Sequence, residues 1–192
     1  MDQNSQEEQK LLVQDIIARI NSIKNYYRVF DEYVVSVAES LNAERGFIML
    51  KMKGTEDMKV FGTHNLNPES IATTADISQS VINDVAEKGK AIVSVDAMKD
   101  PRFQDKTSVV ISGLRSILCV PLKIKGITVG ILYLDNRYKG SAFRDQHLEV
   151  LTSFLDAASP VMEALYSRLE ASEKIKDKRI DKRVVPKKRS GI

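Results

Sequence analysis

The sequence predicts an α+β fold, in which helices pack on one face of a mostly antiparallel β-sheet and long helices lie at the N- and C-terminal ends. Two observations indicate this class. Apolar residues recur at three- and four-residue steps from Leu12 to Leu41 and from Phe143 to Leu169, as in amphipathic helices. Between these segments, short alternating or continuous apolar runs are separated by turn residues, which is typical of strands.

The first expected element is an N-terminal helix. Ser5 and Glu8 have the spacing of a capping box, and neither Pro nor Gly occurs from Gln6 to Arg45, so one long helix or two nearly collinear helices are expected. Residues 1–24 precede the compact body, and their apolar stripe needs a partner to cover it. A second copy of the chain is the predicted partner, with dimer contacts through Leu12, Ile16, Ile20 and Ile23.

The centre of the chain predicts five strands. Residues 46–52 and 58–63 form one expected hairpin, and residues 116–123 and 127–134 form a second around Lys125-Gly126. Between them we expect a helix from Ile77 to Lys88, ended by a left-handed Gly89, and a strand from residue 91 to 95. A loop over 96–103 and a short helix over 106–113 complete this part.

The last expected helix starts near Phe143 and carries Pro160 in its interior. A proline there removes a backbone hydrogen bond, so the helix is expected to bend near Asp156. Pro121 near the end of a predicted strand is expected at an edge or a bulge. These elements divide the chain into an N-terminal helix of residues 1–24, a domain of residues 25–170 and a basic, flexible tail of residues 171–192.

Composition limits the classes of function. The net charge of +3 comes from a +6 tail, residues 168–192, and a body of −3, so it does not indicate a nucleic-acid-binding surface on the body. The tail has no aromatic residues among its charges, and a protein partner is preferred to nucleic acid. One cysteine, no long uncharged apolar run and no signal-peptide pattern favour a cytoplasmic protein that does not insert into membranes.

Three ordered blocks resemble a known family. The segments DAMKDPRF (96–103), GLRSILCVPL (113–122) and GILYLDN (130–136) are similar to the central part of GAF domains, and the resemblance covers about Tyr26 to Tyr166. It implies a PAS-related fold of small bacterial-type modules that are mostly regulatory and not enzymes. It further implies a small-molecule pocket, and terminal helices that pair in dimers and transmit a signal to a partner signalling or scaffold protein.

The resemblance also implies where a ligand would bind. Arg102 and Arg115 could each hold a phosphate or carboxylate, or could instead pair with Asp96, Asp100 or Asp105 and fix the loop. Both interpretations stay open. The ligand-binding candidates by family position are Ser94, Asp96, Arg102, Phe103, Val109, Gly113, Arg115, Ser116 and Asn136.

A cyclic nucleotide is one candidate ligand. Family members that bind one carry an Asn-Lys or Asn-Arg pair, then a Phe, then Asp-Glu three residues later. This chain has Asn136-Arg137 and Phe143, but His147 and Leu148 stand where the acidic pair would be. An unknown ligand, or none, is the alternative.

No catalytic constellation is found. The relatives that reduce free methionine sulfoxide rely on several cysteines, whereas this chain has only Cys119, and its two histidines, His64 and His147, are too far apart to predict a metal site. We therefore expect a non-catalytic sensor that signals to a partner. The main alternative is a ligand-free GAF adaptor or structural subunit, and a free methionine sulfoxide reductase is the third.

Overall fold

The computed structural model describes residues 26–55, 57–71, 79–103 and 114–181. The expected dimer stripe of Leu12, Ile16, Ile20 and Ile23, the short helix over 106–113 and the end of the tail lie outside these residues. The elements, in chain order, are α2 (Tyr26–Ser40), β1 (Arg45–Lys51), β2 (Met58–His64), α3 (Pro68–Ile71), α4 (Gln79–Lys88), β3 (Ile92–Ser94), η1 (Pro101–Phe103), β4 (Ser116–Ile124), β5 (Ile127–Asn136) and α6 (Asp145–Asp181).

The five strands form one antiparallel sheet in the order β2-β1-β5-β4-β3. Both predicted hairpins, β1–β2 and β4–β5, are confirmed. The β4–β5 turn has positive φ at Lys125 (51°) and Gly126 (79°), which matches the right-handed twist of the strands it joins. The predicted cap of α4 is also confirmed, because Gly89 has φ 60° and its N–H donates to the carbonyl of Val85 at 2.9 Å.

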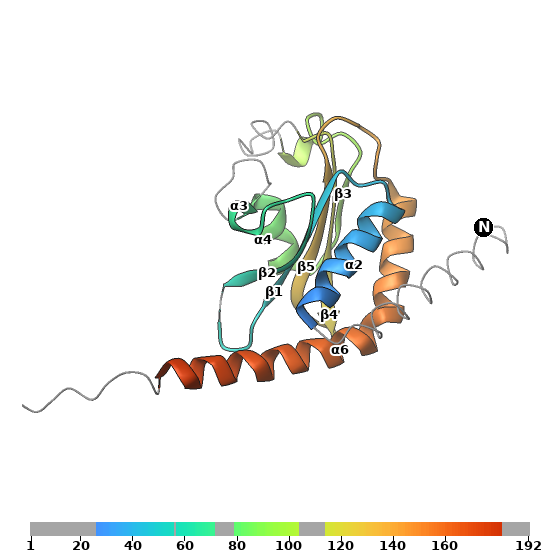
Figure 1. The fold of residues 1–192 in the computed structure, drawn as a ribbon. Helices are drawn as coiled ribbons and strands as arrows, with labels where there is room; N and C mark the ends of the chain where they lie inside the picture. Colours follow the sequence, from blue (N-terminus) through green and yellow to red (C-terminus); the bar gives the residue numbers. More distant parts are fainter. Residues whose placement is uncertain (1–25, 56, 72–78, 104–113, 182–192) are drawn as a thin grey trace, which may run out of the picture.

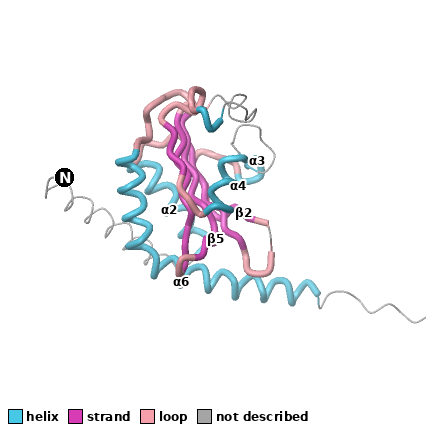
Figure 2. Tube along the Cα trace, turned by 180° about the vertical axis from the view of Figure 1, so that it is seen from behind, coloured by secondary structure: helices cyan, strands magenta, loops and turns pink. Residues whose placement is uncertain are grey.

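Helices cover both faces of the sheet, so the expectation of helices on one face was wrong (Figures 1 and 2). Ile48, Leu118 and Leu132 point into a core shared with α2 and α6. Their strand neighbours point the other way, into a second core shared with α4. The reason is that β4 and β5 are nearly continuous apolar runs, and such strands need cover on both sides.

The helix α6 contains Pro160 and changes direction part-way along its length (Figure 1), as predicted. Its later part is fixed to the β1–β2 hairpin. The hydroxyl of Tyr166 donates to the carbonyl of Lys51 at 2.5 Å, and a carboxylate oxygen of Glu170 accepts from the N–H of Lys53 at 2.8 Å. The sequence placed the start of the tail at residue 171, whereas α6 continues to Asp181.

Close backbone contact between β1 and β5 requires Gly130. A Cβ atom at this position would lie 2.2 Å from the carbonyl oxygen of Met49 and 3.1 Å from the Cα of Leu50. Both are backbone atoms, so they cannot rotate away. The strands would have to separate at the centre of the sheet to admit any side chain.

We therefore expect Gly130→Ala to lower the free energy of unfolding by about 1–3 kcal/mol, the usual cost of overpacking. The matched control is Gly140→Ala, because a Cβ at Gly140 meets its nearest atom at 3.7 Å, an ordinary contact. Urea unfolding of both variants checks this, and equal stability of the two would contradict it.

Candidate functional site

Seven of the predicted ligand residues gather at one end of the sheet. Ser94 ends β3, Ser116 begins β4 and Asn136 ends β5, and the antiparallel pairing sets these three residues side by side. Asp96 and Arg115 lie in the adjoining segments, where the N–H of Ala97 donates to the carbonyl of Arg115. Arg102 and Phe103 lie in η1. The remaining two candidates, Val109 and Gly113, lie outside the described residues.

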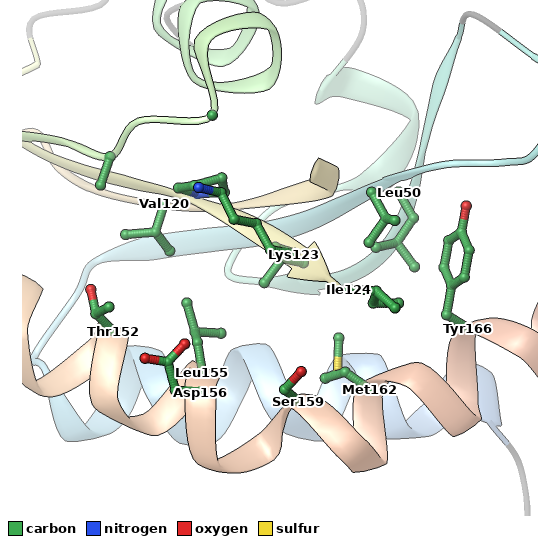
Figure 3. Close-up of a pocket in the computed structure, with 15 residues that line it drawn as sticks. Leu50, Val120, Lys123, Ile124, Thr152, Leu155, Asp156, Ser159, Met162 and Tyr166 are labelled. Carbon is green, nitrogen blue, oxygen red and sulfur yellow. The ribbon is translucent and has the colours of Figure 1, made fainter. Parts of the chain in front are cut away.

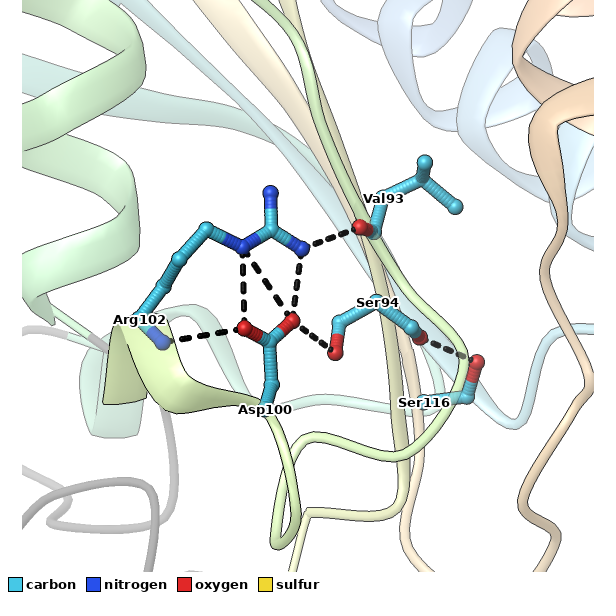
Figure 4. Close-up of polar contacts among 5 residues, drawn as sticks. All are labelled: Val93, Ser94, Asp100, Arg102 and Ser116. Carbon is cyan, nitrogen blue, oxygen red and sulfur yellow. Dashed lines mark hydrogen bonds and ion pairs between the residues drawn. The ribbon is translucent and has the colours of Figure 1, made fainter. Parts of the chain in front are cut away.

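The Asp100 carboxylate accepts hydrogen bonds from both Arg102 and Ser94 (Figure 4). The sequence indicated it only as a possible ion-pair partner of an arginine. Arg102 donates to its carboxylate through Nε at 2.9 Å and Nη2 at 2.6 Å, and Nη2 also donates to the carbonyl of Val93 at 2.6 Å. The hydroxyl of Ser94 donates to the same carboxylate at 2.7 Å. The hydrogen bonds from Arg102 lower the pKa of Asp100 to about 2. The arrangement fixes the loop onto β3.

The second arginine is held less tightly. The distance from Arg115 Nη2 to Asp96 Oδ2 is 3.4 Å, and the Arg115 side chain is 45% exposed. The other oxygen of Asp96, Oδ1, is buried and has no hydrogen-bond partner among the described residues. The Ser116 hydroxyl already makes two hydrogen bonds within the chain, because it donates to the carbonyl of Ser94 at 2.8 Å and accepts from the N–H of Phe143 at 3.1 Å. Of the polar groups at this end, Arg115 and Asp96 are thus the most available to a ligand.

The pair Asn136-Arg137 makes contacts within the chain. The Asn136 amide donates to the carbonyl of Asn42 at 3.2 Å. Arg137 donates to the carboxylate of Glu44 from its backbone N–H at 2.8 Å and from Nε at 2.7 Å. These contacts join the end of β5 to the segment between α2 and β1, and a ligand at this pair would have to displace them.

A cavity of about 270 Å³ lies on the α6 face of the sheet, away from the sheet end (Figure 3). Its strand wall is the end of β4, and its helix wall is α6 on both sides of Pro160. β3 pairs only with Ile117 to Cys119, so Pro121 lies on a stretch of β4 that β3 does not cover, as expected for an edge position. The cavity is lined by Leu50, Gly89, Ala91, Val120, Pro121, Leu122, Lys123, Ile124, Val129, Thr152, Leu155, Asp156, Ser159, Met162 and Tyr166.

The sequence did not identify this cavity. The prolines in β4 and α6 marked where an edge and a bend would occur, but no pattern indicated that the two would face each other.

The only cysteine does not resemble a nucleophile. Cys119 is buried in the core on the α4 side of the sheet, and this burial raises the pKa of its thiol well above the ordinary range. His64 contacts the amide of Asn65, and His147 accepts from the backbone N–H of Arg144. Within the described ranges, no three side chains of His, Cys, Asp or Glu stand close enough to hold a metal ion.

The family model for the GAF domain matches residues 26–161, which include the whole sheet and α6 as far as Val161. The chain belongs to the GAF domain family. Solved GAF domains share its fold. That of an Acinetobacter phosphoenolpyruvate-protein phosphotransferase is 18% identical with a TM-score of 0.67, covering 87% of this chain and 98% of that one. That of the corresponding Coxiella burnetii protein is 15% identical with a TM-score of 0.64, covering 83% and 95%.

The free methionine-R-sulfoxide reductase of Neisseria meningitidis, solved with its substrate, also shares the fold. It is 16% identical, with a TM-score of 0.60 and coverage of 87% of this chain and 91% of that one. At these identities the likeness concerns the fold alone.

The lowered pKa of Asp100 predicts a pH dependence. In the unfolded chain the carboxyl group has its ordinary pKa of 3.8, so between about pH 4 and pH 2 the unfolded state binds more protons than the folded state. The contribution of Asp100 to stability is therefore complete above this window and is lost as the pH falls through it. We expect Asp100→Asn to be less stable than the wild type at pH 6 and to lose less stability between pH 5 and pH 3. Urea unfolding at each pH measures this, and parallel losses in the two proteins would contradict it.

The burial of Cys119 predicts that its thiol reacts with iodoacetamide only when the protein unfolds. The labelling rate of the native protein should be far below that of the chain in urea, because both the thiolate form and access to the sulfur are suppressed. Mass spectrometry of the labelled protein measures this. Rapid labelling under native conditions would contradict the inert role and reopen the reductase alternative.

Proposed function

We propose that this GAF domain is a non-catalytic regulatory module that binds a small molecule and signals to a partner protein through its terminal helices. The observation that carries the proposal is that one wall of the 270 Å³ cavity is α6 itself, on both sides of its interior proline. A molecule in this cavity would contact the element that leads out of the domain. Binding would therefore favour whichever arrangement of α6 fits it better.

The contacts of α6 support the transmission of a signal through this helix. Before Pro160, Leu151 and Phe154 are buried against the sheet and α2, and the ring of Phe154 lies 5.2 Å from that of Tyr33. After Pro160, the bonds of Tyr166 and Glu170 attach the helix to the β1–β2 hairpin. A change of angle at the bend would thus move one anchored half relative to the other.

The sheet end is the second place where a ligand could act, and a cyclic nucleotide remains the candidate there. Arg115 is half exposed and weakly paired, so it could turn to a phosphate. Arg102, Asn136 and Arg137 would each have to break the internal contacts described above. The internal contacts of Arg102, Asn136 and Arg137 also suit the ligand-free adaptor, which is the second candidate function.

We further propose that the module acts as a homodimer through the stripe from Leu12 to Ile23, with the basic tail as a docking segment for a partner protein. Among the described residues, none of the helices has the length and apolar character needed to cross a membrane.

The signalling proposal predicts a coupled response to ligand. In a thermal-shift screen of the full chain against cyclic mono- and dinucleotides and free amino acids, a ligand at a hundredfold excess over its Kd should add about 2.7 kcal/mol of stability. The same ligand should change amide hydrogen exchange in α6 from residue 152 to 170. Stabilisation by a ligand without any change in α6 would contradict the proposed route.

Tyr166→Phe is the matched variant for this experiment, because it removes only the hydroxyl that binds the carbonyl of Lys51. The change in exchange should reach the β1–β2 hairpin more weakly than in the wild type, because only the bond between Glu170 and Lys53 then joins this part of α6 to the hairpin.

A further inference from the structure

We infer that the loops of residues 95–103 and 137–144 bind the surface of an anionic lipid bilayer. In this arrangement the apolar side chains of the loops enter the headgroup layer, and their lysines contact the lipid phosphates. The inference goes beyond the proposed sensor function, because it involves neither the cavity beside α6 nor a ligand in that cavity.

Exposed apolar side chains gather in these two loops. Among the described residues, four large apolar side chains are exposed, and three of them are in the loops: Val95 and Met98 are nearly half exposed, and Tyr138 is 84% exposed. The fourth, Ile127, lies beside the β4–β5 turn at the opposite end of the sheet. Single exposed apolar side chains are ordinary on a protein surface, whereas a concentration of them at one end indicates an interaction surface.

The two loops lie side by side. Val95 follows β3 and Tyr138 follows β5, and both strands end at the same end of the sheet (Figure 1). The N–H of Ser141 donates to the carbonyl of Val95 at 2.7 Å, and the N–H of Ala97 donates to the carbonyl of Arg115 at 2.9 Å. Figure 1 shows both loops beyond the ends of the strands. Their side chains can therefore meet a flat surface before the strands do.

The outermost charges of the loops are positive. The two loops contain five Lys or Arg and two Asp, a net charge of +3, although the chain up to residue 167 carries −3. The carboxylates of Asp96 and Asp100 are mostly covered and each lies beside an arginine. By contrast, Lys99 is 82% exposed and Lys139 is exposed as well. An approaching anionic surface thus meets ammonium groups before carboxylates.

Each loop places an exposed apolar side chain directly before an exposed lysine. Met98 is followed by Lys99, and Tyr138 is followed by Lys139. The guanidinium of Arg137 also lies 5.2 Å from the centre of the Tyr138 ring. A bilayer suits this pattern, because its phosphates lie next to an apolar layer and an aromatic ring with a polar tip is stable between the two. An acidic protein would satisfy the lysines, but it would also need a depression for each of two separate apolar tips.

The first test uses fluorescence. The chain has no tryptophan, so a single introduced one reports on its own surroundings. The full chain with Tyr138→Trp is mixed with vesicles of phosphatidylcholine, either alone or with about 30% phosphatidylserine. Its emission should move to shorter wavelength with the anionic vesicles only. Ile127→Trp is the matched control at the opposite end and should not respond. No shift for Tyr138→Trp, or equal shifts for both variants, would overturn the proposal.

The second test separates the loops from the basic tail, which can itself bind anionic vesicles. Lys99→Gln combined with Lys139→Gln should lower partitioning onto the anionic vesicles roughly twentyfold, or about fivefold for each cation, in a sedimentation assay. The matched control combines Lys90→Gln with Lys123→Gln, which are exposed lysines at the opposite end of the sheet, and it should bind as the wild type does. Equal losses in the two double variants would overturn the proposal.

An acidic protein surface is the competing occupant, and poly-L-glutamate is the probe for it. Emission of Tyr138→Trp that responds to poly-L-glutamate and not to the anionic vesicles would identify an acidic protein as the partner and overturn the membrane proposal. A response to the vesicles alone supports it. Neither result depends on whether a small molecule binds beside α6.

Discussion

The rest of the structure depends on the need to cover the two central strands on both faces. Every residue of β5 from Gly130 to Asn136 is buried, and β4 is buried from Ser116 to Val120. Because neighbouring side chains point to opposite faces, these strands feed two separate cores. No single helical layer can cover both. The helices α2 and α6 therefore close one side and α4 closes the other, which makes α6 part of the core and not an appendage.

A buried ion pair specifies how the central strands align. Arg45 in β1 lies opposite Asp135 in β5, and Nε and Nη2 of the arginine reach the two carboxylate oxygens at 2.8 and 2.7 Å. Both side chains are almost completely buried. Such a pair adds little net stability compared with apolar residues, since removing two charges from water is costly. A one-residue slip, however, would leave both charges buried and apart, so the pair strongly favours the observed register.

The sequence predicted the elements whose signals are local. Lys125-Gly126 and Gly89 are positions where the backbone needs positive φ, and Pro160 removes a hydrogen bond wherever its helix packs, so these features could be inferred without tertiary structure. The side of the sheet that α4 covers could not be inferred in this way. Val81, Ile82 and Val85 give the helix an apolar face, but the same face fits either side of a two-sided sheet.

The candidate sites show the same limit. The resemblance placed seven residues at the sheet end, where strand pairing does bring them together. Asp100 was expected as one of three possible partners of Arg102, but the sequence did not indicate that Ser94 and the carbonyl of Val93 would join this pair and tie it to β3. The cavity was missed because it depends on the short pairing of β3 with β4 and on the path of α6 across the uncovered part of β4. Both are properties of the assembled fold.

The bend in α6 accounts for both the cavity and its connection to the rest of the chain. The first half of the helix packs on the sheet with α2, while the second half crosses to the β1–β2 hairpin, where Tyr166 binds Lys51. A straight helix cannot follow both directions, and Pro160, which lacks the N–H for one backbone hydrogen bond, lies between the two halves. Leu155 and Asp156 precede the proline and Met162 follows it, and all three line the cavity, so a molecule bound there would contact the helix on both sides of its proline.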